Sequence, residues 1–75
     1  MEERKAFLLF CLKHFGLKVI KEEDDKLFFL EQGYCIELES NGLLKLLHAG
    51  QVIAPFSDVE ELCDFIQQDM RLQNG

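Results

Sequence analysis

The chain has 75 residues, of which 48% are hydrophobic, and it carries a formal net charge of −6 at neutral pH. This length supports one small domain, and this hydrophobic content, with seven phenylalanines, argues against an intrinsically disordered chain. Lysine and arginine form no clusters, which disfavours nucleic-acid binding because phosphates must be neutralised by such clusters. We therefore expect a single compact acidic domain over residues 1–75 that binds no nucleic acid.

No stretch approaches the roughly 20 apolar residues that a membrane-spanning helix needs. The apolar run at 6–12 follows two glutamates, where a signal peptide would have positive charge. The three cysteines are odd in number and far apart in the chain, which is typical of free thiols in a reducing compartment. They are Cys11, Cys35 and Cys63. These features predict a cytoplasmic protein with no membrane partner.

The first predicted element is a helix over Glu2–Phe15, which Gly16 ends by adopting a left-handed conformation. Its main apolar face consists of Phe7, Leu8, Cys11, Leu12 and Phe15. Leu9 and Phe10 lie toward the opposite side, so the apolar arc is wide. Such a helix packs against both a sheet and a second helix, and Leu9 and Phe10 are also secondary interface candidates.

A first strand is predicted at Leu17–Lys21, followed by a solvated acidic loop at Glu22–Asp25. From residue 27 to residue 56, short apolar segments are separated by two-residue turns that contain glycine. These turns are Gln32-Gly33, Asn41-Gly42 and Ala49-Gly50. Consecutive strands joined by such turns are antiparallel neighbours, which predicts a meander sheet.

The second helix has a predicted capping box, formed by Ser57 and Glu60, after Pro55 ends the last strand. Its apolar residues repeat at the helical period. They are Val59, Leu62, Cys63, Ile66 and Met70. Residues 72–75 are expected to form a frayed tail. The predicted fold is therefore α+β, in the order α-β-β-β-β-β-α, with both helices packed on one face of the antiparallel sheet.

Two-residue loops also predict which strand residues stand opposite one another, and residues directly opposite share a face. The predicted core face contains Leu27, Phe29, Tyr34, Ile36, Leu38, Leu43, Leu47, Val52, Ala54 and Phe56. The other face is about half apolar, with Cys35 and the polar residues Lys26, Glu37, Glu39 and His48 interleaved among five large apolar residues. These five are Phe28, Leu30, Leu44, Leu46 and Ile53. Because a solvent-facing side should be mostly polar, these five residues predict a protein interface, with a homodimer as its most common use.

An alternative function from a different class is an acidic inhibitor, similar in role to an immunity protein or an antitoxin, that masks a basic surface. The contacts would then be carboxylates of the loop, the sheet and the second helix. The loop and sheet residues are Glu22, Glu23, Asp24, Asp25, Glu37 and Glu39.

A small enzyme or ligand carrier is a third possibility, because the predicted register makes Cys35 and His48 cross-strand neighbours beside Glu37. A flat sheet face offers no pocket and no oxyanion donors, so we predict no catalytic activity. Cys11 and His14 have the spacing of two metal ligands, but the chain has no second pair for a structural zinc site. We therefore predict neither a metal nor a cofactor.

Overall fold

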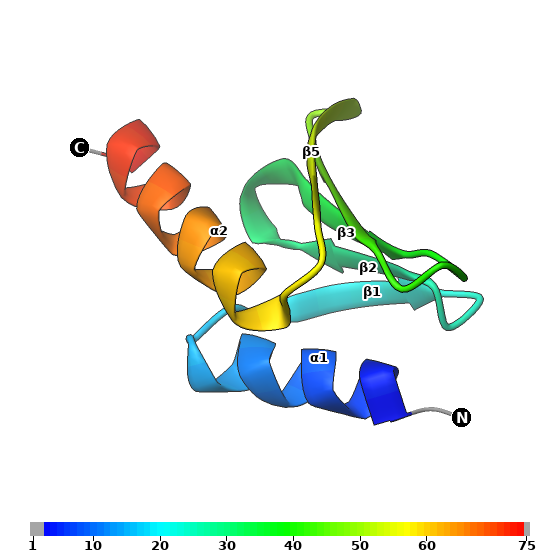
Figure 1. Ribbon diagram of the computed structural model, residues 1–75. Coiled ribbons are helices and arrows are strands. Elements are labelled where there is room, and N and C mark those ends of the chain that lie inside the picture. The colour runs from blue at the N-terminus through cyan, green and yellow to red at the C-terminus, as the bar shows by residue number, and fades with distance from the viewer. Residues whose placement is uncertain (1–2, 75) are drawn as a thin grey trace.

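The computed structural model of the protein describes residues 3–74, which form two helices and one five-stranded sheet (Figure 1). The elements are α1 (Glu3–His14), β1 (Val19–Glu23), β2 (Leu27–Leu30), the short 3₁₀ turn η1 (Glu31–Gly33), β3 (Tyr34–Leu38), β4 (Leu44–His48), β5 (Gln51–Phe56) and α2 (Val59–Asn74). The strands are antiparallel in the order β1-β2-β3-β4-β5, and both helices lie on one side of the sheet. The predicted α+β meander is confirmed.

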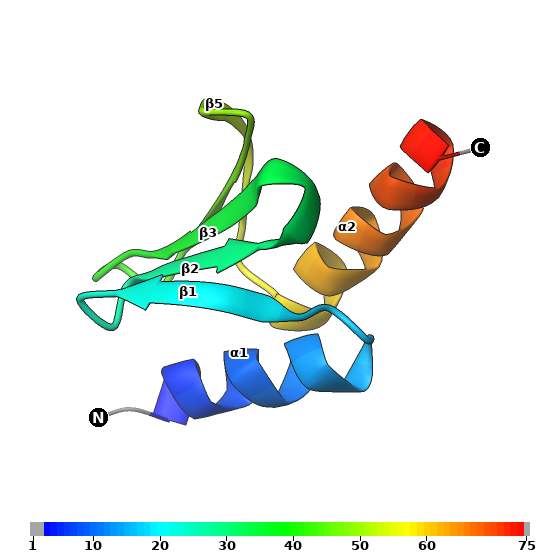
Figure 2. The same ribbon diagram turned by 180° about the vertical axis from the view of Figure 1, so that it is seen from behind.

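Seen from behind, the sheet has no helix on its other face within residues 3–74 (Figure 2). Neither α1 nor α2 is both long and apolar enough to cross a membrane.

Helix α1 ends in a Schellman motif that leads the chain back toward the sheet. The N–H of Leu17 donates to the Leu12 carbonyl at 2.7 Å, and the N–H of Gly16 donates to the Lys13 carbonyl at 3.0 Å. Gly16 has a φ of +76°, which confirms the predicted left-handed end. Because Leu17 belongs to this motif, β1 begins at Val19, two residues later than predicted. The predicted first helical residue, Glu2, lies outside the described residues.

Two of the three predicted hairpin loops contain an odd number of residues, which changes the register of the sheet. Phe28 pairs with Ile36 across the three-residue turn η1, and Leu38 pairs with Leu44 across residues 39–43. A shift of one residue moves every side chain of a strand to the other face. As a result, β2 and β4 present the opposite faces from those predicted.

Four of the five predicted interface residues therefore lie in the core. Phe28 and Leu46 are 0% exposed, and Leu30 and Leu44 are 2% exposed. They pack with Tyr34 and Ile36 of β3 against the helices. The predicted placement of Phe28, Leu30, Leu44 and Leu46 on the open face was wrong, because it assumed two-residue loops.

The hairpin between β4 and β5 has the predicted two-residue loop. Ala49 and Gly50 both have positive φ, at +55° and +82°, and Leu47 pairs with Val52. One residue further along, the register shifts at a β-bulge, so that Leu46 pairs with Ala54. The extra residue in β5 is Ile53, which is 39% exposed at the free edge of the sheet.

The cap of α2 lies one residue later than predicted. The N–H of Glu60 donates to the side-chain oxygen Oδ1 of Asp58 at 3.2 Å, and the N–H of Leu62 donates to the Asp58 carbonyl. Asp58 is therefore the N-cap, and the predicted capping box of Ser57 and Glu60 was wrong. The helix continues to Asn74 through residues expected to fray, and Gly75 lies outside the described residues.

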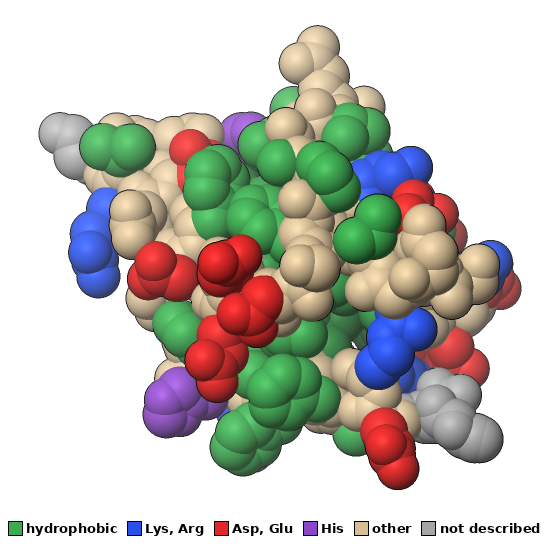
Figure 3. Space-filling model, in the orientation of Figure 1, with side chains coloured by type: hydrophobic (Ala, Val, Ile, Leu, Met, Phe, Trp, Pro, Cys, Tyr) green, Lys and Arg blue, Asp and Glu red, His purple; other side chains and the backbone are tan. Residues whose placement is uncertain are grey.

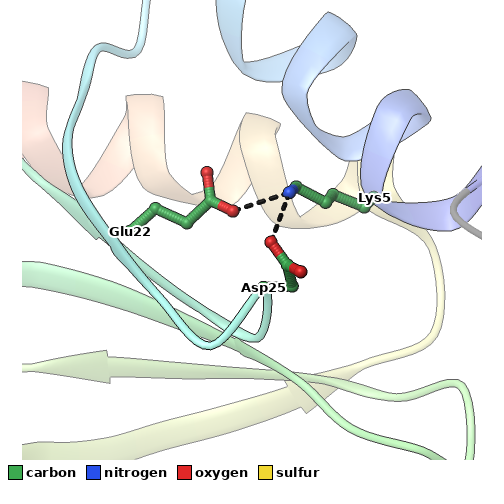
Figure 4. Close-up of polar contacts among 3 residues, drawn as sticks. All are labelled: Lys5, Glu22 and Asp25. Carbon is green, nitrogen blue, oxygen red and sulfur yellow. Dashed lines mark hydrogen bonds and ion pairs between the residues drawn. The ribbon is translucent and has the colours of Figure 1, made fainter.

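Polar contacts attach both helices to the sheet. The amino group of Lys5 on α1 lies 2.6 Å from Asp25 and 2.7 Å from Glu22, at the β1–β2 hairpin (Figure 4). The hydrogen bond to Asp25 is the largest cause of a raised pKa at Lys5, and the hydrogen bond to Glu22 is the next largest. The same hydrogen bond from Lys5 lowers the pKa of Asp25. On the other helix, Asp69 accepts a hydrogen bond from the Tyr34 hydroxyl of β3.

Candidate functional site: the open sheet face

The face of the sheet turned away from the helices is the candidate site, and we call it the open face. The strand register assigns to it Lys21, Glu23, Leu27, Phe29, Cys35, Glu37, Lys45, Leu47, Val52 and Pro55. Leu27, Phe29, Leu47 and Val52 were predicted to face the core, and that placement was wrong, because the loop lengths bring a different apolar set to this face.

The open face contains a hollow of about 500 Å³ whose lining is mostly apolar. Its apolar residues include Ile20, Leu27, Phe29, Cys35 and Leu47. Ile20 belongs to the β-bulge of the edge strand β1 and is 59% exposed, while Val52 of the other edge strand is 58% exposed. The apolar residues that line the hollow thus form a continuous apolar surface across neighbouring strands, which we call the apolar floor.

The charged side chains around this floor are paired with one another. Lys45 lies 3.1 Å from Glu39 and 3.6 Å from Glu37, and these carboxylates raise the pKa of its amino group. On the other side, Lys21 lies 2.9 Å from Glu23 and above the Phe29 ring. Each lysine of the open face therefore has a glutamate beside it, and little net charge remains.

Cys35 lies on the open face, but its surroundings do not activate the thiol. Burial raises the pKa of Cys35, and the nearby carboxylates of Glu37 and Glu23 raise it further. A nucleophilic cysteine needs the opposite shift, which a neighbouring cation or a helix N-terminus provides.

His48 is not the neighbour of Cys35 that the sequence predicted. Cys35 pairs with Leu47, whereas His48 pairs with Tyr34 on the helix side of the sheet. The rings of His48 and Tyr34 stack with centroids 4.3 Å apart, and Nε2 of His48 donates to the Gln32 carbonyl at 3.0 Å. Since the two side chains lie on opposite faces, the predicted Cys35–His48 pair does not form.

The possible metal ligands of the sequence are also separated. Cys11 is buried in the core, whereas His14 is exposed and its ring lies between those of Phe10 and Phe15. Cys63 is buried on α2, and this burial is the main reason that its pKa rises to about 12. Among residues 3–73, whose side chains are described, no three histidine, cysteine or acidic side chains form a metal-binding group.

Several carboxylates predicted to contact a basic partner are already paired inside the protein. Glu22 and Asp25 contact Lys5, Glu23 contacts Lys21, and Glu37 and Glu39 contact Lys45. Asp24 is exposed in the β1–β2 turn, where its φ is +54°.

The secondary interface candidates lie on α1 and do not join the open face. Leu9 is half-buried against the core, whereas the Phe10 side chain is 66% exposed. Ile53 is the one predicted interface residue that remains accessible in the sheet, at its edge.

A cross-strand charge pair could have revealed the apolar set that the sequence prediction missed. The observed register places Glu37 opposite Lys45, and the predicted register separates them. Opposite charges facing each other stabilise a strand pair, so they favour the observed register. Comparison of the chain with protein-family models, curated proteins and solved structures finds no match, so its function is inferred from these residues alone.

Proposed function

We propose that this protein is a non-catalytic interaction module that forms a homodimer through its open face. The observation that supports this most directly is strand β2, which reads Leu27-Phe28-Phe29-Leu30. Strands that are apolar on both sides are typical of sheets covered on both sides. The helices cover Phe28 and Leu30, whereas Leu27 and Phe29 lie half-buried on the open face and are available to a partner surface.

The composition of the open face fits an interface with a second copy. Phe29, Leu27 and Leu47 provide an apolar centre, and the paired lysines and glutamates provide a polar rim. Because each of the two lysines lies beside a glutamate, this face carries little net charge, and two copies can approach with little repulsion. The acidic residues of α2, among them Glu60 and Glu61, belong to an element on the other side of the sheet.

The acidic-inhibitor alternative has less support, because five of its six named carboxylates already have a lysine partner. A cytoplasmic location remains part of the proposal, and the free thiols of the three cysteines are consistent with it.

Size-exclusion chromatography with light scattering tests the homodimer. We expect the wild-type protein to have twice the monomer mass at high concentration, and Leu47→Glu to be monomeric. Leu47 is a better target than its neighbour Leu46, whose replacement would place a charge in the core. Circular dichroism should show that the Leu47→Glu variant remains folded.

Leu72→Glu is the matched control, because the same substitution is made at a residue of α2 that is 80% exposed. This variant should dimerise like the wild type. A wild-type protein that stays monomeric at all concentrations, or a Leu47→Glu variant that still dimerises, would contradict the proposal.

A further inference from the structure

A second surface, formed by α1 and the start of α2, has properties that the open face does not explain. Phe7 is 46% exposed and Phe10 is 66% exposed, although the same helix buries Leu8, Cys11 and Leu12. A helix that is apolar on all sides is normally buried on all sides. The exposed aromatic side of α1 therefore lacks the cover that its composition predicts.

A hollow of about 410 Å³ lies beside Phe7. Its apolar lining consists of Phe7, Leu38, Leu44 and Val59, so residues from α1, the sheet and α2 all contribute. This hollow has room for an apolar side chain of a partner, and Phe10 extends the apolar surface by one turn of α1.

Carboxylates border this apolar surface. Glu3 and Asp58 line the hollow, and Glu60 and Glu61 are exposed in the first turn of α2. Figure 3 shows acidic side chains over the start of α2, next to hydrophobic side chains over α1. Burial and then the charges of Glu60 and Asp58 raise the pKa of Cys11.

The nearby cations offset these carboxylates only in part. Arg4 also lines the hollow, and its guanidinium keeps its positive charge while it donates to the neutral Glu39 carbonyl at 2.9 Å, so it offsets one of the four carboxylates. Lys5 is held by Glu22 and Asp25 of the β1–β2 hairpin. The border of the hollow therefore presents negative charge to a partner, in contrast to the balanced open face.

We propose that this α1–α2 surface binds a basic amphipathic segment of another protein. An apolar side chain of that segment occupies the hollow beside Phe7, a second packs on Phe10, and its lysines or arginines contact Asp58, Glu60 and Glu61. A second copy of this acidic chain, or an anionic membrane, would bring like charges together here. The proposal does not depend on the homodimer, because it uses different residues.

A titration of the full ¹⁵N-labelled protein with two synthetic helical peptides tests this inference by NMR. The first peptide has leucines and one phenylalanine on one face and lysines on the other, and in the second peptide every lysine is glutamate. We expect the lysine peptide to shift the amide signals of Phe7, Phe10 and Val59, with an affinity that decreases as salt increases. The glutamate peptide should leave these signals unchanged.

Variants then separate the apolar contribution from the charged one. Phe10→Ala should weaken binding of the lysine peptide about tenfold, as expected for truncation of a central aromatic contact. The double variant Glu60→Gln/Glu61→Gln should weaken binding and reduce its salt dependence. Leu47→Glu on the open face should bind like the wild type, whether or not the homodimer forms.

Three outcomes would overturn the inference. These are equal binding of the glutamate peptide, an unchanged affinity of Phe10→Ala, and signal changes centred on Phe29 and Leu47 in place of the α1–α2 surface. Urea denaturation of each variant establishes that a loss of binding does not arise from loss of the fold.

Discussion

At the scale of single residues, Tyr34 connects the sheet to α2 and has a strongly perturbed ionisation. The side chain is almost fully buried, its ring stacks on His48, and its hydroxyl donates to Asp69. Burial raises the pKa of Tyr34 to about 12, and the hydrogen bond to Asp69 contributes further. The protein therefore stabilises the neutral phenol over the phenolate.

This shift predicts a loss of stability at alkaline pH. Because the folded pKa of Tyr34 lies above the ordinary value of about 10, its contribution is complete below pH 10. It disappears as the pH rises through the folded pKa, and amounts to about 2–3 kcal/mol. Tyr34→Phe should therefore be less stable than the wild type at pH 8, and the difference should shrink by pH 11.5.

Urea denaturation of the wild type and of Tyr34→Phe at the two pH values measures the difference in their free energies of unfolding. The lysines titrate equally in both proteins, so their effect cancels in this comparison. Tyr34 is the only tyrosine of the chain, so ultraviolet absorbance of the phenolate reports its titration directly. A stability difference that does not change with pH, or a phenolate that appears near pH 10 in the folded protein, would contradict this prediction.

At the scale of elements, turns and helix ends position the candidate surfaces. The odd-numbered loops before β3 and β4 bury Phe28 and Leu46, and the same loops turn Phe29 and Leu47 to the open face. At α2, Asp58 both caps the helix and lines the hollow beside Phe7.

The observed cap predicts which of two neighbouring substitutions destabilises α2. Asp58→Ala should lower the free energy of unfolding by about 1 kcal/mol, because the Glu60 N–H loses its acceptor. Asp58→Asn retains a side-chain oxygen and should behave nearly like the wild type. Ser57→Ala should change stability by less than about 0.5 kcal/mol. Urea midpoints measure all three, and an equal cost for Ser57→Ala would mean that the helix begins one residue earlier.

At the scale of the whole molecule, the two proposed surfaces differ in charge. The open face combines an apolar floor with paired charges, whereas the α1–α2 surface borders exposed aromatics with carboxylates. A balanced face suits a second copy, and a negative one suits a basic partner. The fold thus places two chemically distinct surfaces on opposite sides of one small core.

The labelling rates of the three cysteines test which side chains are accessible on the open face and which are buried in the core. Cys35 is partly exposed on the open face, whereas Cys11 and Cys63 are buried. N-ethylmaleimide should therefore label Cys35 first, slowly because its pKa is raised, and the other two only on unfolding. If the open face forms the homodimer, the labelling rate of Cys35 should fall as the protein concentration rises.

Mass spectrometry of the labelled protein measures these rates, and the Leu47→Glu variant provides the control. Its Cys35 should react at the same rate at every concentration. A wild-type rate that is also independent of concentration would contradict dimerisation through the open face. Equal labelling of all three cysteines would contradict the packing of the core.

The amino-acid sequence by itself determined the order of the elements and the nature of several turns. Gly16 ends α1, Ala49-Gly50 joins β4 to β5, and the helical period of α2 identifies its buried side. These features depend on interactions between residues a few positions apart, such as turn conformations and helix periodicity. The pairing of Glu37 with Lys45 was also available in the sequence as an indicator of register.

Only the tertiary structure decided which apolar residues face outward. A loop with an odd number of residues and one with an even number are both locally acceptable between β2 and β3, where the structure has the three residues 31–33. The two choices bury different alternate side chains of β2. The choice depends on how Phe28, Leu30, Leu44 and Leu46 fit against α1 and α2, and these contacts join residues far apart in the chain. The bulge at Ile53 has the same origin, because it aligns Phe56 with Leu44 beneath the helices. Local patterns do not encode such packing, and the Glu37–Lys45 pair is the one cross-strand indication of it in the sequence that we identify.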